Sequence, residues 1–223
     1  MRNRSGKLNV TDPDAGQAVF VAQTDAAGRY GSFSVDANGN WSFALNNGGE
    51  TVQALGAGEM LSETFTVTTA DGTRGSVVIT IVGTNDQPEL SGALTGTVTE
   101  NGVQTAIGQL ITTDVDANDT HSYSIIGNAT GAYGSFSVDE NGQWTYQLDN
   151  DAAQPLRAGE TRTETYQVQV SDGKGGVDTQ TVTITINGAD VSAIITPAVP
   201  GADRGVVQED VTLAASGKLD VVD

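Results

Sequence analysis

The sequence contains no cysteine, and this absence removes three kinds of chemistry together. Disulfide bonds, zinc sites built on thiolates and catalysis by a thiol nucleophile all require cysteine side chains. Secreted domains often rely on disulfides for stability, so a secreted chain of this kind needs another source of stability. Bound metal ions are one such source.

Positive charge is also scarce. The chain has 28 acidic residues against 10 lysines and arginines, which gives a formal net charge of −18. Nucleic acid is therefore excluded as a partner, because phosphate contacts need clustered cations. A chain this acidic repels itself when it is compact, and divalent cations would offset that repulsion. Improved solubility is the simpler explanation of the same charge.

Long apolar runs, histidines and aromatic residues are few. No stretch is long enough to insert into a membrane. The single histidine, His121, lies in a polar segment and cannot build a zinc site alone. No long loops suggest a substrate cleft, so we expect no enzymatic activity. Aromatic residues make up 5% of the chain, which leaves few candidates for an exposed ligand platform.

The sequence repeats itself with a period of about 100 residues, the size of one domain. The heptapeptide Tyr30–Asp36 recurs letter for letter as Tyr133–Asp139. We divide the chain into repeat 1 (residues 1–88), repeat 2 (residues 89–190) and a segment of residues 191–223. We expect that last segment to contain a linker and the opening strand of a third repeat.

The opening strand of the repeat is missing from repeat 1. Residues Leu94–Glu100 open repeat 2, and Gly205–Glu209 resembles the opening of a third repeat. We therefore expect the chain to be a piece of a longer array. An unpaired sheet edge seeks a partner, so strand exchange between two such chains is also expected to be possible.

Apolar and polar residues alternate along many short segments, as they do in antiparallel sheets with one buried face. Val182–Ile186 is one example. The segments that begin at Trp41 and Trp144 alternate in the same way, which predicts that both tryptophans lie on the buried face. Short strands and tight turns in each repeat predict an all-β fold of tandem antiparallel β-sandwiches, of the immunoglobulin or cadherin type, in an elongated array. One short turn of helix is expected within residues 52–61.

The recurring motifs resemble a known family. Both repeats contain Tyr-Gly-x-Phe-x-Val-Asp, then Asn-Gly-x-Trp, Gly-Glu and Asp-Gly, and repeat 1 ends in Gly83-Thr-Asn-Asp-Gln-Pro88. This order resembles the VCBS repeats of very large bacterial RTX-type adhesins. The resemblance covers both repeats and implies type I secretion, an extracellular location on the bacterial surface, and a role in adhesion and biofilm formation.

Acidic residues gather where one repeat ends and the next begins. The linker contributes Asn85 and Asp86, an opening strand ends at Glu100, and a loop contributes Asp114 and Asp116. Calcium takes six to eight oxygen ligands, and side chains of these types supply them. The order resembles the interdomain calcium sites of cadherins, so we expect these residues to bind Ca²⁺ together. The corresponding residues elsewhere in the array are Asp12, Asp14, Asp190, Glu209 and Asp223.

Two functions follow from these patterns as hypotheses. The first is a calcium-stiffened extender, or stalk, of a cell-surface adhesin, whose partners are the neighbouring repeats. Contact with a host or abiotic surface would then be made through other regions of the protein. The second is a module that binds a carbohydrate or another surface ligand. Asp and Asn also shape turns, and for Asp36, Asn38 and Asp71 we expect that role only.

Overall fold

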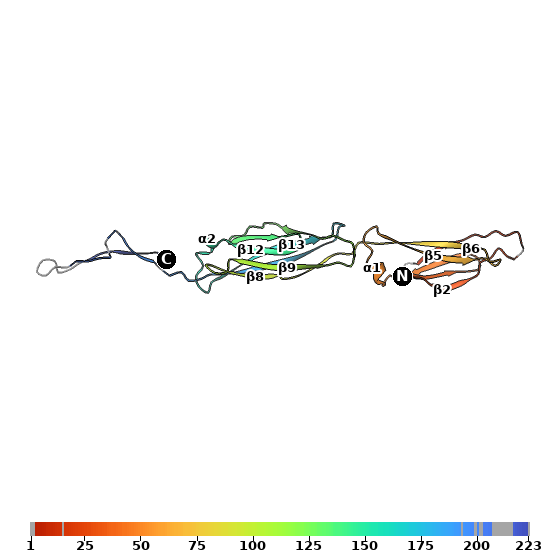
Figure 1. Ribbon diagram of the computed structural model, residues 1–223, viewed down its shortest axis with the longest axis horizontal. Helices are drawn as coiled ribbons and strands as arrows, with labels where there is room; N and C mark the ends of the chain where they lie inside the picture. The colour runs from red at the N-terminus through yellow and green to blue at the C-terminus, as the bar shows by residue number, and fades with distance from the viewer. Residues whose placement is uncertain are drawn as a thin grey trace.

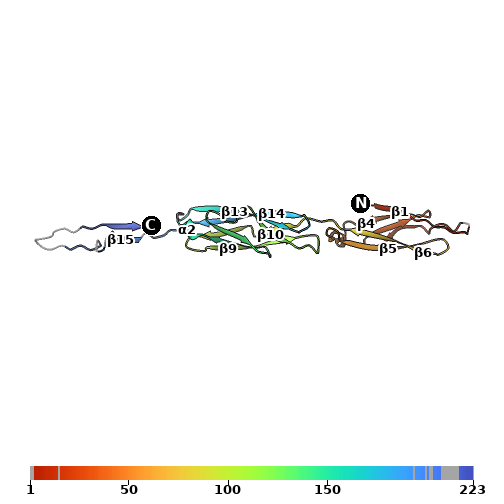
Figure 2. The same ribbon diagram turned by 90° about the horizontal axis from the view of Figure 1, so that it is seen from above.

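The computed structural model describes residues 3–14, 16–192, 194–198, 200, 203–206 and 216–222. These residues form an elongated rod in which two β-sandwiches follow one another along the long axis (Figures 1 and 2). Within the described residues no helix is long and apolar enough to cross a membrane. The predicted all-β class, with antiparallel sandwiches in an elongated array, is confirmed.

Repeat 1 has two facing sheets and one short helix, α1 (Glu50–Gln53), which falls on the edge of the predicted helical turn. The first sheet has the order β1-β4-β3-β2, and the second pairs β5 with β6. The strand bounds are β1 (Asn3–Lys7), β2 (Gln23–Ala27), β3 (Gly31–Val35), β4 (Asn40–Leu45), β5 (Met60–Thr68) and β6 (Arg74–Val82).

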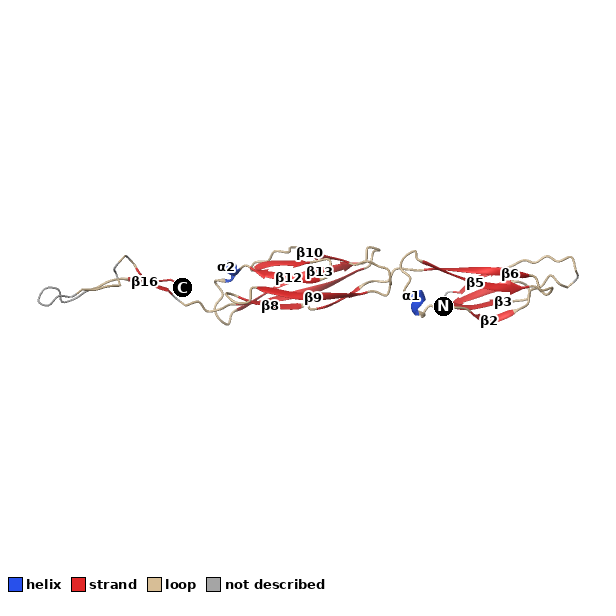
Figure 3. Ribbon diagram, viewed as in Figure 1, coloured by secondary structure: helices blue, strands red, loops and turns tan. Residues whose placement is uncertain are grey.

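Repeat 2 is also a two-sheet sandwich, with two additional strands, β7 and β8. Its sheets have the orders β11-β12-β9-β7 and β10-β13-β14-β8. Its strand β10 pairs with β13 in the second sheet, whereas β2 of repeat 1 pairs with β3 in the first sheet. The helix α2 (Asn150–Ala153) lies at the same end of its repeat as α1 (Figure 3). The strand bounds are β7 (Glu89–Gly92), β8 (Thr95–Thr99), β9 (Thr105–Thr113), β10 (Ser122–Ile126), β11 (Gly134–Val138), β12 (Gln143–Leu148), β13 (Thr161–Ser171) and β14 (Val177–Asn187).

The alternating apolar residues of facing strands form a separate core in each repeat. In repeat 2, Phe136 stacks on Tyr166 with ring centroids 4.6 Å apart. The corresponding pair in repeat 1, Phe33 and Phe65, stacks at 4.8 Å. Such offset aromatic pairs add to the gain from burial, so both copies of the repeat keep the same central contact.

Among the described residues, repeat 1 has no strands in the places of β7 and β8. β8 runs parallel to β14 and completes one wall of the core of repeat 2. Trp144 is fully buried there, whereas its counterpart Trp41 is only half-buried. The expectation that both tryptophans lie inside their sandwiches is therefore confirmed fully for Trp144 alone.

A two-stranded hairpin follows repeat 2, formed by β15 (Ile194–Pro197) and β16 (Leu219–Val222). Its register, in which Pro197 lies opposite Leu219, corresponds to that of β7 and β9, in which Gly92 lies opposite Leu110. The sequence pattern that predicts a third opening strand continues through residues 207–209, which lie outside the described residues.

Candidate metal centre between the two repeats

Three segments meet where repeat 1 joins repeat 2. They are the linker of residues 83–88 after β6, the loop of residues 114–121 after β9, and the turn of residues 172–176 between β13 and β14 (Figure 1). Antiparallel pairing returns the chain to the same end of the sandwich, and this brings the loop and the turn beside the linker. We refer to this region as the junction.

The loop after β9 turns its acidic residues inward. The backbone N–H of Asp116 donates to Asp114 Oδ1 at 3.0 Å, and the N–H of Asp119 donates to the Asp116 carbonyl at 3.3 Å. These bonds form the local turns that Asp favours. Asp116 is only 2% exposed, and the side chains of Asp114 and Asp119 are each 2% exposed. The loop therefore withdraws its carboxylates from water.

The linker binds to this loop and to the turn beside it. The backbone N–H of Asp86 donates to Asp116 Oδ2 at 2.8 Å. The side-chain amide of Asn85 donates to Asp172 Oδ2 at 2.7 Å. The linker residues predicted to bind metal are thus held against acidic side chains of repeat 2.

Asp172 organises the turn between β13 and β14 and also faces the junction. Its carboxylate accepts the backbone N–H groups of Lys174 at 2.7 Å and Gly176 at 3.0 Å. A Cβ at residue 176 would collide with Asp172 Oδ2, so glycine is required there. The amide of Asn85, followed by these backbone donors, holds the pKa of the Asp172 carboxyl below its usual value, against the effect of burial.

Carboxylate oxygens of Asp114, Asp119 and Asp172 all lie within 4.8 Å of one another. Two unit negative charges at that separation repel by about 3–4 kcal/mol at an effective dielectric constant near 20. Nearby nitrogens offset part of this repulsion. Lys174 Nζ lies 3.7 Å from Asp119 Oδ1, and His121 Nε2 lies 3.2 Å from Asp114 Oδ2.

Three buried oxygens at the junction have no hydrogen-bond partner among the described residues: Asn85 Oδ1, Asp116 Oδ1 and Asp119 Oδ2. Buried polar atoms are normally paired, and each exception calls for an explanation. A bound cation satisfies several such acceptors at once, because metal ions accept lone pairs from all of them. The oxygens come from the linker and from the acidic loop, the two segments that meet at the junction.

Repeat 1 reaches the acidic loop through a few direct bonds. Asn118 Nδ2 donates to Glu59 Oε1 at 2.8 Å, and the backbone N–H of Ala117 donates to the Ala54 carbonyl at 3.3 Å. The cadherin resemblance offers Glu59 or Glu63 as the acidic contribution of the preceding domain, and of the two it is Glu59 that bonds to Asn118. Glu59 thereby contacts the loop that carries the carboxylates.

The structure brings together part of the predicted metal-binding set. Asn85, Asp86, Asp114 and Asp116 meet at the junction, where Asp86 takes part through its backbone N–H. Asp12 and Asp14 form the matching turn of repeat 1, in which the N–H of Asp14 donates to Asp12 Oδ1 at 2.8 Å. Glu209 and Asp223 lie outside the described residues.

Glu100 does not join Asp114 and Asp116, and the prediction that groups them is wrong. β8 runs parallel to β14, so β8 ends beside the last residues of β14, far from the turn at Asp172 where β14 begins. Glu100 is 1% exposed and accepts the N–H of Ala189 at 3.1 Å, at the end of repeat 2 that faces residues 191–223. The exposed Asp190 follows Ala189 at that same end.

Sequence reasoning missed Asp119 and Asp172 as candidate ligands. Asp172 has the Asp-Gly pattern of a tight turn, and that role explains its presence without a metal. The one signal for a metal-binding role is that Asp172 directly follows β13, a strand that ends beside the linker. Asp119 lies three residues after Asp116 in the same acidic loop. The sequence shows this spacing but not that the side chain of Asp119 points toward Asp114 and Asp172.

Two β-sandwiches in line, with a buried acidic cluster between them, define the class of tandem β-sandwich repeats. The chain matches the bacterial cadherin-like domain family twice, over residues 2–83 and 85–188. It belongs to that family.

Among curated proteins, the calcium-binding lectin RapA2 of Rhizobium johnstonii is 28% identical over 185 residues, which cover 75% of this chain and 76% of that protein. Among solved structures, PcdhgB3 EC1-4 has a TM-score of 0.53 at 17% identity and covers 99% of this chain. The match spans 54% of that longer structure. Mouse clustered PcdhgC3 EC1-3 gives a TM-score of 0.47 at 16% identity, with 84% of this chain and 62% of that chain covered. The match to PcdhgB3 EC1-4 supports the cadherin-like fold alone.

Proposed function

We propose that the chain is an extracellular module of the adhesin type, in which a calcium ion bound at the junction joins repeat 1 to repeat 2. One observation carries the proposal. Three buried oxygens without hydrogen-bond partners, from Asn85, Asp116 and Asp119, lie in the region where the carboxylates of Asp114, Asp119 and Asp172 converge. A cation would both satisfy the acceptors and remove the repulsion.

The donor chemistry favours calcium among the common ions. Every candidate ligand is a carboxylate or amide oxygen, which suits hard cations and does not suit the nitrogen and sulfur preferences of zinc. Calcium accepts irregular sets of six to eight oxygens, whereas magnesium demands a compact octahedron. Asn85, Asp114, Asp116, Asp119 and Asp172 would hold the ion, with Glu59 close to the same loop.

The ion would act mechanically. Without it, the carboxylates repel one another and only a few hydrogen bonds connect the repeats. With it, the linker and the acidic loop would share one rigid coordination shell. Extracellular calcium modules bind with dissociation constants of about 0.1–1 mM, so the junction would be loose in the cytosol and stiff outside the cell.

The family and the named relative support this reading. The relative is named a calcium-binding lectin, and the chain belongs to a bacterial cadherin-like family. We place the chain in the stalk of a surface adhesin, secreted by a type I pathway and used in adhesion and biofilm formation, as the VCBS resemblance implies. Its immediate partners would be the neighbouring repeats, and we assign it no catalytic role.

The two outer ends of the described sandwiches would then carry half-sites of the same kind. Glu100 and Asp190 lie at the end of repeat 2 that faces residues 191–223, and Asp12 and Asp14 lie in the loop that follows β1, the counterpart of the loop after β9. We propose that each half-site is completed by the adjoining repeat of an array. Glu209 and Asp223 are the sequence counterparts that would serve a third repeat.

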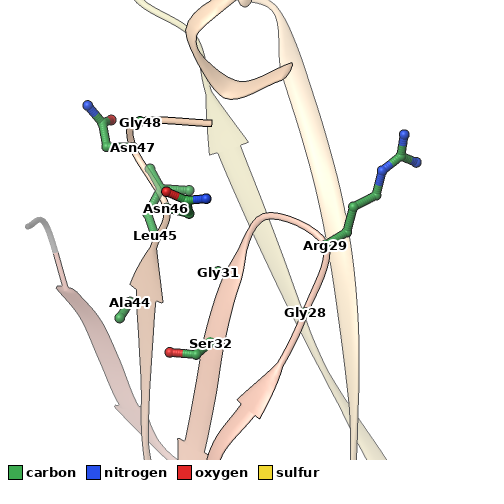
Figure 4. A pocket seen from close by; sticks show the side chains of 9 residues that line it. All are labelled: Gly28, Arg29, Gly31, Ser32, Ala44, Leu45, Asn46, Asn47 and Gly48. Carbon is green, nitrogen blue, oxygen red and sulfur yellow. The ribbon is translucent and has the colours of Figure 1, made fainter. Parts of the chain in front are cut away.

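A ligand-binding module is the second candidate, and one pocket favours it. A depression of about 500 Å³ in repeat 1 is lined by Arg29, Ser32, Asn46 and Asn47, together with Leu45, Ala44 and glycines (Figure 4). These side chains offer hydrogen bonds to a polar ligand such as a sugar. No aromatic ring is among the residues that line it, so the stacking surface that commonly holds sugars is missing. Binding of the whole chain to a glycan array, abolished by Asn46→Ala with Asn47→Ala, would favour this second function.

Matched variants of the two repeats test the calcium proposal. Asp172→Asn removes a carboxylate from the junction, and Asp71→Asn makes the same change in the same turn of repeat 1, away from the junction. In calorimetric titrations with calcium, we expect Asp172→Asn to weaken binding by about tenfold or more, equivalent to about 1.4 kcal/mol. We expect Asp71→Asn to bind calcium as the wild type does. Equal binding by all three proteins would contradict the proposal.

A further inference from the structure

The turn between β13 and β14 brings a positive side chain to the acidic junction. Lys174 Nζ lies 3.7 Å from Asp119 Oδ1. The backbone N–H of the same residue donates to Asp172 Oδ1 at 2.7 Å. Lys174 therefore contacts two of the three carboxylates that converge at the junction, one through its charge and one through its main chain.

The two members of the ion pair between Lys174 and Asp119 differ in their access to water. The side chain of Asp119 is 2% exposed, whereas that of Lys174 is 44% exposed. Gly173 and Gly175 flank Lys174, and a Cβ added at either glycine would meet no heavy atom of the described chain within 4 Å. The carboxylate is thus fixed inside the junction, and the ammonium lies at its surface on a flexible stem that has room to turn outward.

An ammonium group satisfies a junction of this kind only in part. It carries one charge and three donors, whereas calcium carries two charges and binds six to eight oxygens. Lys174 reaches Asp119 Oδ1, but Asp119 Oδ2 and Asp116 Oδ1 stay buried without a hydrogen-bond partner among the described residues. The lysine therefore lowers the repulsion between the carboxylates without satisfying every oxygen.

The corresponding turn of repeat 1 folds without such a charge. Asp71-Gly72 aligns with Asp172-Gly173, so Thr73 takes the place of Lys174. The N–H of Thr73 donates to Asp71 Oδ1 at 3.1 Å, as the N–H of Lys174 does to Asp172. The turn itself therefore needs no lysine side chain, and the charge of Lys174 acts on the junction.

We propose that Lys174 is a built-in competitor of the calcium ion, which stabilises the calcium-free junction and sets the calcium concentration at which the ion takes its place. This inference rests on the proposed function, because the ion would bind among the same carboxylates. Calcium binding would turn the ammonium away from Asp119 into water. The lysine and the ion repel each other, so the lysine lowers the calcium affinity of the junction.

The net charge of the ligands is what tunes the affinity of a calcium site. The carboxylates of Asp114, Asp116, Asp119 and Asp172 would bind the ion strongly, and the positive charge of Lys174 offsets one of them. The lysine therefore moves the junction toward the affinity of extracellular modules, about 0.1–1 mM. At lower calcium concentrations it would keep the acidic loop neutral enough to hold the linker.

Calorimetric titration of the whole chain with calcium chloride in low-salt buffer tests the competition. We expect Lys174→Met to bind calcium about three- to tenfold more tightly than the wild type, because a neutral side chain of similar length removes the opposing charge. Lys174→Arg keeps the charge and should stay within about twofold of the wild type.

The titration separates failure of this inference from failure of the proposed function. Wild-type binding with no gain in Lys174→Met overturns the competitor role alone. Weaker binding by Lys174→Met also overturns it, and would show that Lys174 orients Asp119 as a ligand. Absence of calcium binding in both proteins contradicts the proposed function and this inference with it.

Amide hydrogen exchange in calcium-free buffer tests the stabilising role of Lys174. The N–H of Asp86, bonded to Asp116 Oδ2, reports whether the linker stays on the acidic loop. We expect this amide to exchange about three- to tenfold faster in Lys174→Met than in the wild type or Lys174→Arg. The N–H of Val21, bonded to the Thr68 carbonyl at 2.8 Å, is the control in repeat 1 and should not change. Equal exchange of the Asp86 amide in the three proteins overturns this role.

Discussion

Asp172 and Asp71 occupy the same position in two successive repeats, yet their side chains have different partners. Asp71 accepts hydrogen bonds from Thr69 and Thr73 within its own turn. Asp172 accepts bonds from its own turn and also from Asn85 in the linker. Among the described residues, the turn residue of repeat 2 therefore also contacts a linker, whereas that of repeat 1 contacts only its own turn.

The lowered pKa of Asp172 makes repeat 2 sensitive to acid in calcium-free buffer. The folded pKa lies below the unfolded value of about 3.9, so the ionised carboxylate stabilises the fold at higher pH. That contribution is lost as the pH falls through the folded pKa. We expect the free energy of unfolding of Asp172→Asn, measured with urea between pH 5 and pH 2, to fall less steeply than that of the wild type.

The exposed Asp190 provides the control for this experiment. Asp190→Asn should follow the wild-type profile, because Asp190 is exposed. A profile for Asp172→Asn that is parallel to the wild type would show that the hydrogen bond from Asn85 does not stabilise the ionised form.

Glu59 and Glu160 form a second matched pair. Each accepts a backbone N–H three residues earlier, from Gly56 at 3.1 Å and from Arg157 at 3.0 Å. Only Glu59 also contacts Asn118 across the junction. We expect Glu59→Ala to weaken calcium binding by about tenfold, as does the loss of groups that orient metal ligands, and Glu160→Ala to leave it unchanged in the same titration. An equal effect of the two substitutions would argue against a contribution from repeat 1.

At the scale of elements, β8 covers one edge of the hydrophobic core of repeat 2. Gly96 lets this strand approach the core, since an added Cβ would lie within 3.1 Å of Trp144, Ile184 and Ala106. Gly96→Ala should therefore destabilise repeat 2 by about 1–3 kcal/mol, the usual effect of overpacking a core. Thermal or urea unfolding measures this change.

Gly102 is the control for Gly96. An added Cβ there meets Thr99 at no less than 3.4 Å, which is an ordinary contact. Gly102→Ala should leave stability within about 0.5 kcal/mol of the wild type, as surface substitutions usually do. Similar losses for the two variants would mean that the close approach of β8 does not matter.

The strands could be predicted well from the sequence, because alternation of period two directly records which face is buried. Val182, Ile184 and Ile186 follow that pattern and are all fully buried. The parallel pairing of β8 with β14 could not be predicted, because alternation carries no strand direction. This is why Glu100 was assigned to the wrong end of its repeat.

The candidate site could be predicted only in part, for a related reason. Asn85, Asp114 and Asp116 can be predicted because they lie in the linker and in the loop that are close together in the repeat pattern of the sequence. Asp172 is 87 residues away from Asn85, and only the three-dimensional fold brings their side chains into contact. The Asp172-Gly173 motif is also fully explained by a tight turn, so it gives no separate indication of metal binding.

At the scale of the whole molecule, the net charge of −18 and the elongated form belong together. A rod places its charges far apart, and within the part of the chain that the structure describes the one cluster of three carboxylates lies where the repeats meet. The proposed structural role of calcium is therefore confined to a small number of junctions, separated by sandwiches whose cores need no ion. The loss of calcium should loosen the rod at its junctions and leave the sandwiches folded.

The most direct test is a crystal structure of the chain grown with millimolar calcium, with anomalous scattering data collected at a long X-ray wavelength. The account predicts a strong anomalous peak among the side chains of Asn85, Asp114, Asp119 and Asp172, with oxygen ligands at about 2.3–2.6 Å. A well-ordered junction that shows no peak at this place under those conditions would contradict it.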